Sequence, residues 1–208
     1  MASRPEFVYL DLGNVLFAFD RDRAFRQMAA VCGAAPEAVA EAVMGGGLQA
    51  DIEAGRIDWP GFHAEFGRRT GTTSDPAALA RAASDMFTLK ADMIPVLAAL
   101  ERIGCPFGIL SNTCGIHWDH LRAGGWAPLT GAVSRIVLSH EVGAAKPDRR
   151  IFAAAEAAAG VPAGRIFFTD DLPEHVAGAR AAGWDAELFT SACGLIAALH
   201  ERGLNLGL

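Results

Sequence analysis

The apolar residues of this chain fall into two kinds of pattern. Short, nearly continuous apolar runs, such as Phe107-Gly-Ile-Leu110 and Ile166-Phe-Phe168, are typical of strands buried on both faces of a parallel sheet. From residue 91 onward these runs alternate with stretches of helical spacing, which predicts a doubly wound α/β fold with a parallel sheet. The predicted strands are Glu6–Leu10, Pro106–Leu110, Arg135–Leu138, Arg165–Thr169 and Asp185–Phe189. The predicted core helices are Ala91–Ile103, His117–Ala123, Asp148–Ala159, Glu174–Ala182 and Ser191–Glu201.

Residues 20–90 have a different character. Their alanine-rich stretches have helical spacing and contain no convincing strand, and glycines at positions 45–47, 55 and 71 separate them. We therefore expect a small helical domain inserted after the first strand, so that residues 1–19 and 91–208 together form the α/β core. The helices predicted in the insertion are Arg23–Val31, Pro36–Met44, Trp59–Arg69 and Pro76–Leu89.

The composition narrows the class of protein. Of the 208 residues, 51% are hydrophobic and 20% are charged, and the net charge is −6. No apolar run approaches the ~18 residues of a membrane span, and negative charge without a basic block argues against nucleic-acid binding. We therefore expect a soluble cytoplasmic protein that acts on a small molecule, with neither nucleic acid nor membrane as a partner. The oligomeric state is left open.

Polar residues follow the predicted core strands at the points where the strands end. Asp11-Leu-Gly-Asn14 follows the first strand, and Ser111-Asn-Thr113 follows the second. Lys146 lies in the segment after the third strand, and Asp170-Asp171 follows the fourth. Ligands of parallel sheets bind beyond the carboxyl ends of the strands, so we expect these groups to share one site. Adjacent carboxylates at the end of a buried strand repel each other, and a hard cation such as Mg²⁺ would relieve this repulsion.

Each of these groups also has an ordinary structural explanation. Asp11 could be a turn residue, and Ser111-Asn-Thr113 could cap the helix that follows, although helix N-termini also bind anions. Lys146 could be a solvated loop residue. However, only Lys90 and Lys146 among the 18 basic residues are lysines, and a lysine is a compact charge that reaches where an arginine fork does not fit. Together, each at a strand end, the four groups are far more specific than any one alone.

Four segments of the chain resemble the four motifs of the haloacid dehalogenase-like (HAD) hydrolase superfamily. They are Asp11-Leu-Gly-Asn-Val15, Leu110-Ser-Asn-Thr113, Lys146-Pro147 and Asp170-Asp171. The resemblance covers essentially the whole chain, and residues 20–90 lie where this superfamily carries its C1 cap. Within the superfamily, the chain looks most like the subgroup of bacterial sugar-phosphate phosphatases of the α-glucose-1-phosphatase type and the amino-terminal domain of soluble epoxide hydrolases.

The resemblance implies a magnesium-dependent phosphatase acting on a small phosphate ester. Asp11 would be the nucleophile and form an aspartyl-phosphate intermediate, while Lys146 would offset charge on the nucleophile and on the phosphate. The ligands of Mg²⁺ would be the Asp11 carboxylate, the Gly13 carbonyl and Asp171. Asp170 would assist as a ligand or through a bound water.

The same resemblance implies a set of phosphate contacts. The Ser111 hydroxyl and the backbone N–H of Asn112 would hold a phosphoryl oxygen. Asn14, in the first motif, and His117, just beyond the second, are the other residues expected to contact the substrate. Catalysis would then consist mainly of positioning and electrostatic stabilisation, as phosphoryl transfer generally does.

One position departs from the superfamily's pattern. Most of its phosphatases read Asp-x-Asp, and the second Asp protonates the leaving oxygen; here that position is Gly13. General acid–base help is typically worth ~10²–10⁴-fold in rate. Three explanations are open: a good leaving group, such as that of an anomeric sugar phosphate, departs unaided; His117 takes over the role; or the site is kept for binding alone. We favour an active phosphatase whose leaving group departs unaided.

A metal-independent 2-haloacid dehalogenase is the alternative enzyme on the same scaffold. It too would use an Asp nucleophile and would lack an acidic residue at position 13. The Asp170-Asp171 pair argues against it, because cleavage of a carbon–halogen bond gives these carboxylates no evident role.

Overall fold

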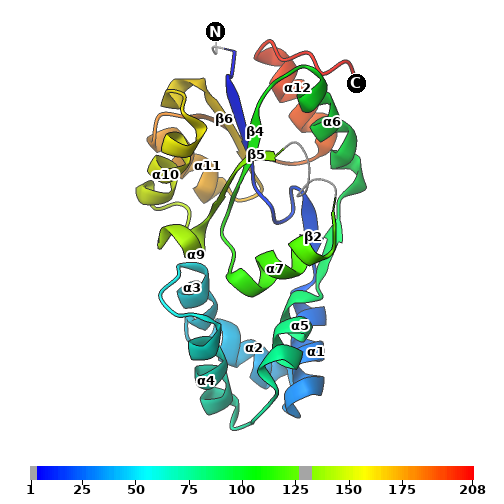
Figure 1. The fold of residues 1–208 in the computed structure, drawn as a ribbon, viewed down its shortest axis with the longest axis vertical. Coiled ribbons are helices and arrows are strands. Elements are labelled where there is room, and N and C mark those ends of the chain that lie inside the picture. The colour runs from blue at the N-terminus through cyan, green and yellow to red at the C-terminus, as the bar shows by residue number, and fades with distance from the viewer. Residues whose placement is uncertain (1–3, 127–132) are drawn as a thin grey trace.

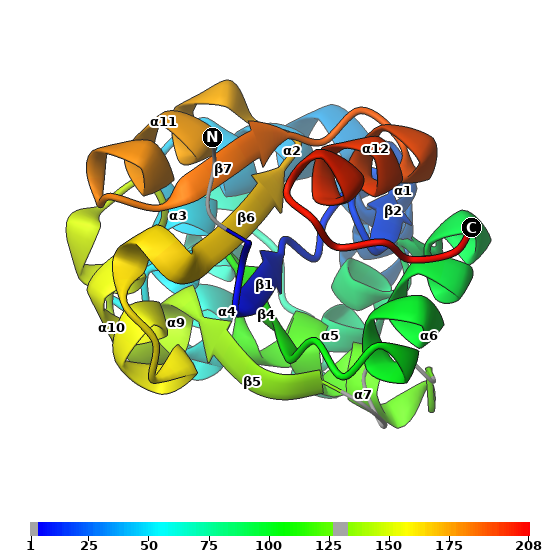
Figure 2. The same cartoon turned by 90° about the horizontal axis from the view of Figure 1, so that it is seen from above.

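The core of the protein is a five-stranded parallel sheet that lies between two layers of helices (Figure 1, Figure 2). The computed structural model describes residues 4–126 and 133–208. The strand order is β5-β4-β1-β6-β7, so the first strand is central. This arrangement confirms the predicted α/β fold class. The strands are β1 (Phe7–Leu10), β4 (Phe107–Ser111), β5 (Val133–Leu138), β6 (Ile166–Asp170) and β7 (Asp185–Leu188).

Side chains that alternate along β1 belong to two separate apolar layers. The helices of these layers are α6 (Ile94–Arg102), α10 (Arg149–Ala159), α11 (Pro173–Ala181) and α12 (Ala192–Glu201). Val8 and Leu10 pack in one layer with α6 and α12, whereas Phe7 and Tyr9 pack in the other with α10 and α11. Because both faces of the sheet are buried, its strands are apolar throughout rather than alternating with polar residues.

A short antiparallel pairing connects the core with the helical insertion. The chain leaves the core through β2 (Phe17–Phe19) and returns through β3 (Phe87–Leu89). The prediction of no strand in this region was therefore wrong, and so was the extension of the last helix to Leu89. That helix ends at Ser84, because the residues that follow hydrogen-bond to β2, which lies far away in the sequence and leaves no trace in local periodicity.

The residues between β2 and β3 form a helical unit, which we call the cap. It has its own apolar core and lies beyond the carboxyl ends of the core strands (Figure 1). The assignment of residues 20–90 as a separate domain stays a prediction. Three cap helices begin at an aspartate whose side chain accepts the N–H three residues on, which stabilises each helix start; these aspartates are Asp20, Asp58 and Asp75. The helices are α1 (Arg21–Cys32), α2 (Pro36–Met44), α3 (Leu48–Glu53), α4 (Trp59–Thr70) and α5 (Pro76–Ser84).

The remaining helices of the core lie close to the positions predicted for them. The stretch predicted as Ala91–Ile103 forms a 3₁₀ turn, η1 (Ala91–Met93), followed by α6, and α7 (Gly115–Ala123) begins slightly earlier than predicted. Two single turns, α9 (Ser139–Val142) and η2 (Ala163–Arg165), were not predicted. Among the described residues, the helices are too short or too polar to cross a membrane.

Candidate active site

The polar residues at the carboxyl ends of the core strands meet in one cavity between the core and the cap. The cavity has a volume of about 290 Å³, close to the lower end of the range of ~300–1,000 Å³ for small-molecule sites. Asp170 lies beside it, with a carboxylate oxygen within 4.8 Å of those of Asp11 and Asp171. The structure therefore brings all the predicted site residues together. Those that line the cavity are Asp11, Gly13, Asn14, Ser111, Asn112, His117, Lys146 and Asp171.

Lys146 is the centre of the polar network. Its side chain is fully buried, and Nζ donates to Asp11 Oδ1 (2.8 Å), to Asp170 Oδ2 (2.5 Å) and to the Leu110 carbonyl (2.9 Å). These bonds use all three N–H donors of the ammonium group. Burial disfavours the charged form, but the two carboxylates outweigh this effect and raise the pKa of Lys146. The alternative of a solvated loop residue is therefore wrong.

Asn112 fixes the loop that carries Lys146. Its Nδ2 donates to the Lys146 carbonyl (3.0 Å), and its Oδ1 accepts from the Lys146 N–H (2.7 Å). Its neighbour Ser111 ends β4 and lines the cavity. The segment does not cap the next helix, because α7 begins after Cys114 and has no side-chain cap. In the fold, Asn112 joins the end of β4 to the loop that carries Lys146.

Two of the three clustered carboxylates face the cavity. Asp11 and Asp171 both line it, as does Gly13, and Asp171 Oδ2 accepts from Asn14 Nδ2 (2.8 Å). Asn14 has a left-handed backbone with φ of 54°, a conformation that asparagine adopts more readily than most residues. Carboxylate and carbonyl oxygens are the ligands that Mg²⁺ prefers, so the donor set of Asp11, Asp171 and Gly13 fits this cation.

Asp170 is instead occupied by protein donors. It is fully buried and accepts from Lys146, from the Leu172 N–H (2.9 Å) and from His175 Nδ1 (3.0 Å). Burial opposes its ionisation, but the Lys146 ammonium and the His175 ring outweigh this effect and hold the pKa of Asp170 below its ordinary value. Asp170 therefore acts as a permanent counter-ion that holds Lys146 in place.

Asp11 has the opposite electrostatic character. Burial, and to a smaller degree the charge of Asp170, raise its pKa to about 6, while Lys146 opposes the increase. A bound cation would shift the balance back toward the carboxylate, because an adjacent positive charge favours the charged form. Of the two buried carboxylates, Asp11 is therefore the one whose charged form the protein stabilises less.

The side of the cavity next to position 13 is aromatic. A Cβ at Gly13 would lie 3.0 Å from Cε1 of Phe19. Phe19 meets Phe87 edge-on with ring centroids 6.4 Å apart, and Phe87 meets His117 edge-on at 5.5 Å. Burial lowers the pKa of His117 to about 4, so its ring is neutral near pH 7. The aromatic wall therefore offers no positively charged imidazolium to a substrate.

The cap contributes polar residues to which we assigned no role from the sequence. Arg21, Gln49 and Glu53 line the same cavity as Asp11 and Lys146. Gln49 and Glu53 lie one turn apart on α3, and Gln49 Nε2 donates to Glu53 Oε1 (2.6 Å). Helix α3 was not among the predicted helices of the insertion. The sequence does contain a signal for it, because apolar and polar residues recur four positions apart between the glycines at 47 and 55.

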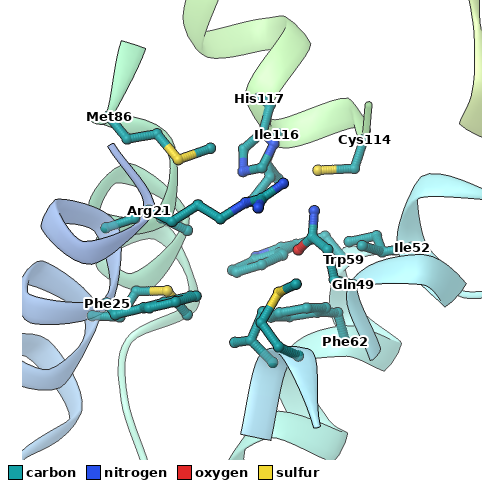
Figure 3. Close-up of a pocket in the computed structure, with 15 residues that line it drawn as sticks. Arg21, Phe25, Gln49, Ile52, Trp59, Phe62, Met86, Cys114, Ile116 and His117 are labelled. Carbon is teal, nitrogen blue, oxygen red and sulfur yellow. The ribbon is translucent and has the colours of Figure 1, made fainter. Parts of the chain in front are cut away.

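A second, narrower cavity adjoins the active site on the cap side (Figure 3). Its volume is about 40 Å³. The two cavities share Arg21, Gln49, Met86 and His117, and Figure 3 shows the Arg21 side chain extending toward His117 and Gln49. The deeper walls are apolar and include Phe25, Ile52, Trp59, Phe62 and Ile116.

Comparison with known sequences gives two matches. A family model described as haloacid dehalogenase-like hydrolase matches residues 8–183. A Mycobacterium tuberculosis protein named as a phosphatase is 35% identical over 97 residues. The latter match covers 47% of this chain and spans less than half, 44%, of that protein's length.

Solved structures share the fold of this chain at lower identity. A HAD family enzyme from Bacteroides thetaiotaomicron, in complex with magnesium and inorganic phosphate, has a TM-score of 0.79 at 22% identity, covering 90% of this chain and 95% of its own. A predicted HAD-like hydrolase from Porphyromonas gingivalis has a TM-score of 0.79 at 24% identity, covering 96% and 98%. The L-2-haloacid dehalogenase of Xanthobacter autotrophicus has a TM-score of 0.64 at 20% identity, covering 88% and 76%.

Proposed function

This chain belongs to the haloacid dehalogenase-like hydrolase family, and on that premise we propose that it is a magnesium-dependent phosphomonoester hydrolase. The observation that carries the proposal is the cluster of Asp11, Asp170 and Asp171, the first two paired with the fully buried Lys146, beside a cavity that Ser111 also lines. Such a site combines a nucleophile, oxygen ligands for a cation and a fixed positive charge, which are the parts that phosphoryl transfer requires.

Asp11 would be the nucleophile. One of its oxygens, Oδ1, accepts from Lys146, which leaves the other carboxylate oxygen to attack phosphorus and form an aspartyl phosphate. Asp11, Asp171 and the Gly13 carbonyl would hold Mg²⁺, with Asp170 assisting through a bound water because its own oxygens are occupied. When bound, Mg²⁺ supplies positive charge that offsets the repulsion between the nucleophile and the phosphate.

The phosphate would be held by the loop after β4. The Ser111 hydroxyl and the backbone N–H of Asn112 would donate to phosphoryl oxygens, and Asn14 would orient Asp171 as well as line the entrance. Lys146 would act through its charge rather than through a direct hydrogen bond, since all three of its donors are in use. His117 would contact the leaving group as a neutral aromatic wall.

The leaving group would extend toward the cap. A sugar phosphate remains a candidate, because an anomeric leaving group needs little acid help. The apolar lining of the narrow cavity additionally favours an ester whose leaving group has a small apolar part beyond the ester oxygen. We therefore propose a small phosphorylated metabolite with mixed polar and apolar character as the substrate class.

A screen of phosphate esters, with Mg²⁺ or with a chelator, tests this function. It should include sugar phosphates, nucleotides, phosphorylated acids and short branched alkyl phosphates, with 2-chloropropionate as the substrate for the dehalogenase alternative. We expect phosphate release with Mg²⁺ and none with the chelator. Halide release that persists in chelator would favour a dehalogenase. Absence of turnover on every ester would leave only a phosphate-binding role.

A further inference from the structure

The proposed reaction needs a proton for the leaving oxygen, and the first motif does not provide one. Gly13 has no side chain, and the Phe19 ring packs so close that even a Cβ at position 13 would lie 3.0 Å from its Cε1. The space that an acidic side chain would occupy is therefore beside an aromatic ring. A proton donor, if there is one, must reach the leaving oxygen from another wall of the cavity.

His117 is not that donor. Burial lowers the pKa of His117 to about 4, with the nearby His120 adding a smaller effect, so the ring carries no extra proton near pH 7. Lys146 has its three donors engaged by Asp11, Asp170 and Leu110. His175 also lines the cavity, but its Nδ1 is engaged by Asp170. Among the residues that the structure describes, the acid on the cavity wall that belongs neither to the metal ligands nor to the Lys146 ion pairs is Glu53 of the cap.

Glu53 is held in a defined position by α3 and by the turn that follows it. Gln49 Nε2 donates to Glu53 Oε1 at 2.6 Å, while Oε2 has no protein partner in the described part of the chain. The next turn contains Gly55, which has φ of 66° and passes so close to the core that a Cβ would lie 2.4 Å from the His140 carbonyl oxygen. This contact places the end of α3, and with it Glu53, at the junction of cap and core.

We propose that Glu53 is the catalytic acid and base of this enzyme, a role that rests on the proposed phosphatase function. In the first step, an Asp11 oxygen bonds to phosphorus, the bond from phosphorus to the ester oxygen breaks, and that oxygen takes the proton from Glu53 Oε2. In the second step, the Glu53 carboxylate accepts a proton from water as the water oxygen bonds to phosphorus. The bond from phosphorus to Asp11 then breaks, which releases phosphate and leaves Glu53 protonated again.

The surroundings of Glu53 support this role. Burial raises its pKa, although the hydrogen bond from Gln49 and the charges of Arg21, Lys146 and His175 oppose the increase. A raised pKa allows a carboxylic acid to hold a proton closer to neutral pH. The neighbouring Cys114 thiol is neutral because burial raises its pKa to about 12. On α9, which packs against α3, the His140 ring is turned to the Thr113 carbonyl at 2.9 Å.

The dependence of rate on the leaving group tests the proposal. Glu53→Gln keeps the shape of the side chain but removes the proton, so kcat/KM should fall by about 10²-fold or more for alkyl phosphates, whose leaving oxygen needs protonation. For an aryl phosphate with an acidic leaving group, such as dinitrophenyl phosphate, kcat/KM should change by no more than about twofold. Glu37→Gln makes the same chemical change at an exposed position on α2 and should alter neither rate.

A second readout separates catalysis from folding. With the aryl phosphate, Glu53→Gln should release a burst of phenolate equal to the enzyme and then turn over slowly, because formation of the aspartyl phosphate survives while its hydrolysis lacks a base. Equal losses on both classes of ester, with no burst, would show that Glu53 is structural. An unchanged kcat/KM for both classes of ester would show that Glu53 takes no part in the reaction. If wild-type enzyme hydrolyses no ester at all, the proposed function has failed, which is a different outcome from either of these.

Discussion

The two walls of the active-site cavity differ in how their polar groups are satisfied. On the core side, Lys146 has three acceptors and Asp170 has donors from three residues, so these charges are fixed by one another. On the cap side, Glu53 has one hydrogen bond, from Gln49, and Arg21 lies over the Phe19 ring at 5.0 Å and forms no ion pair with the described residues. If the proposed function is correct, the fixed charges of the core would serve the phosphate, which is common to all substrates, and the less constrained cap residues would meet the leaving group, which varies.

Removing the nucleophile should have the largest effect. Asp11→Asn keeps the size of the side chain and an oxygen to accept from Lys146, but the amide is a poor nucleophile. We expect no turnover above background with any ester, while the folded state and phosphate binding in Mg²⁺ persist by calorimetry. Activity above a trace would assign the nucleophile to another residue.

Disturbing the fixed charges of the core should have the next largest effect. Lys146→Arg places a broad guanidinium where a compact ammonium is fully buried, so we expect a loss in kcat approaching that of Lys146→Met. Lys146→Met removes the buried positive charge and should also lower the free energy of unfolding by about 3–5 kcal/mol. Denaturant titration and initial rates measure the two effects.

The other lysine is the matched control for that substitution. Lys90 donates to the Asn14 carbonyl (2.9 Å) and lies 4.7 Å from the centre of the Phe189 ring. An arginine is chemically able to form both kinds of contact. Lys90→Arg should keep most of the activity and stability. If Lys146→Arg is tolerated as well as Lys90→Arg, the buried lysine is not required as a compact charge.

Changes on the cap side should act on some esters and not on others. Ala83, on α5, lines the narrow apolar cavity, and Ala83→Leu should fill it. We expect kcat/KM to fall about 10-fold for branched alkyl phosphates and to stay near the wild-type value for glycerol phosphate. An equal fall for both would mean that the cavity does not receive the leaving group, and a melting curve would show whether overpacking is the cause.

The smallest effect on turnover is expected at His117, where the change is in stability. The unfolded chain binds a proton at this residue below its ordinary pKa of 6.5, whereas the folded chain does so only near 4. The unfolded state therefore binds more protons between these values, and the folded state loses stability as pH falls through the range. We expect the wild type to lose roughly 3 kcal/mol relative to His117→Asn between pH 6.5 and 4. Parallel stability curves for the two proteins would contradict a depressed pKa.

The core wall of the site could be predicted from the sequence, because its residues directly follow apolar strands. Asp11, Ser111 and Asp170 each stand at the end of such a run, and parallel strands bring their carboxyl ends to one edge. The cap wall could not be predicted in the same way. The pairing of β2 with β3 and the close approach of Gly55 to His140, which places Glu53, depend on contacts between residues distant in the sequence, and such contacts leave no local pattern.

Trapping the aspartyl phosphate tests the central claim most directly. The wild-type protein would be mixed with a reactive aryl phosphate in Mg²⁺, quenched in acid within milliseconds, digested and analysed by mass spectrometry. We predict one phosphoryl group on the peptide that contains Asp11, and none after chelation of the metal or in Asp11→Asn. Steady turnover without a phosphoryl group on Asp11, or a phosphoryl group that forms equally well in chelator, would contradict the account.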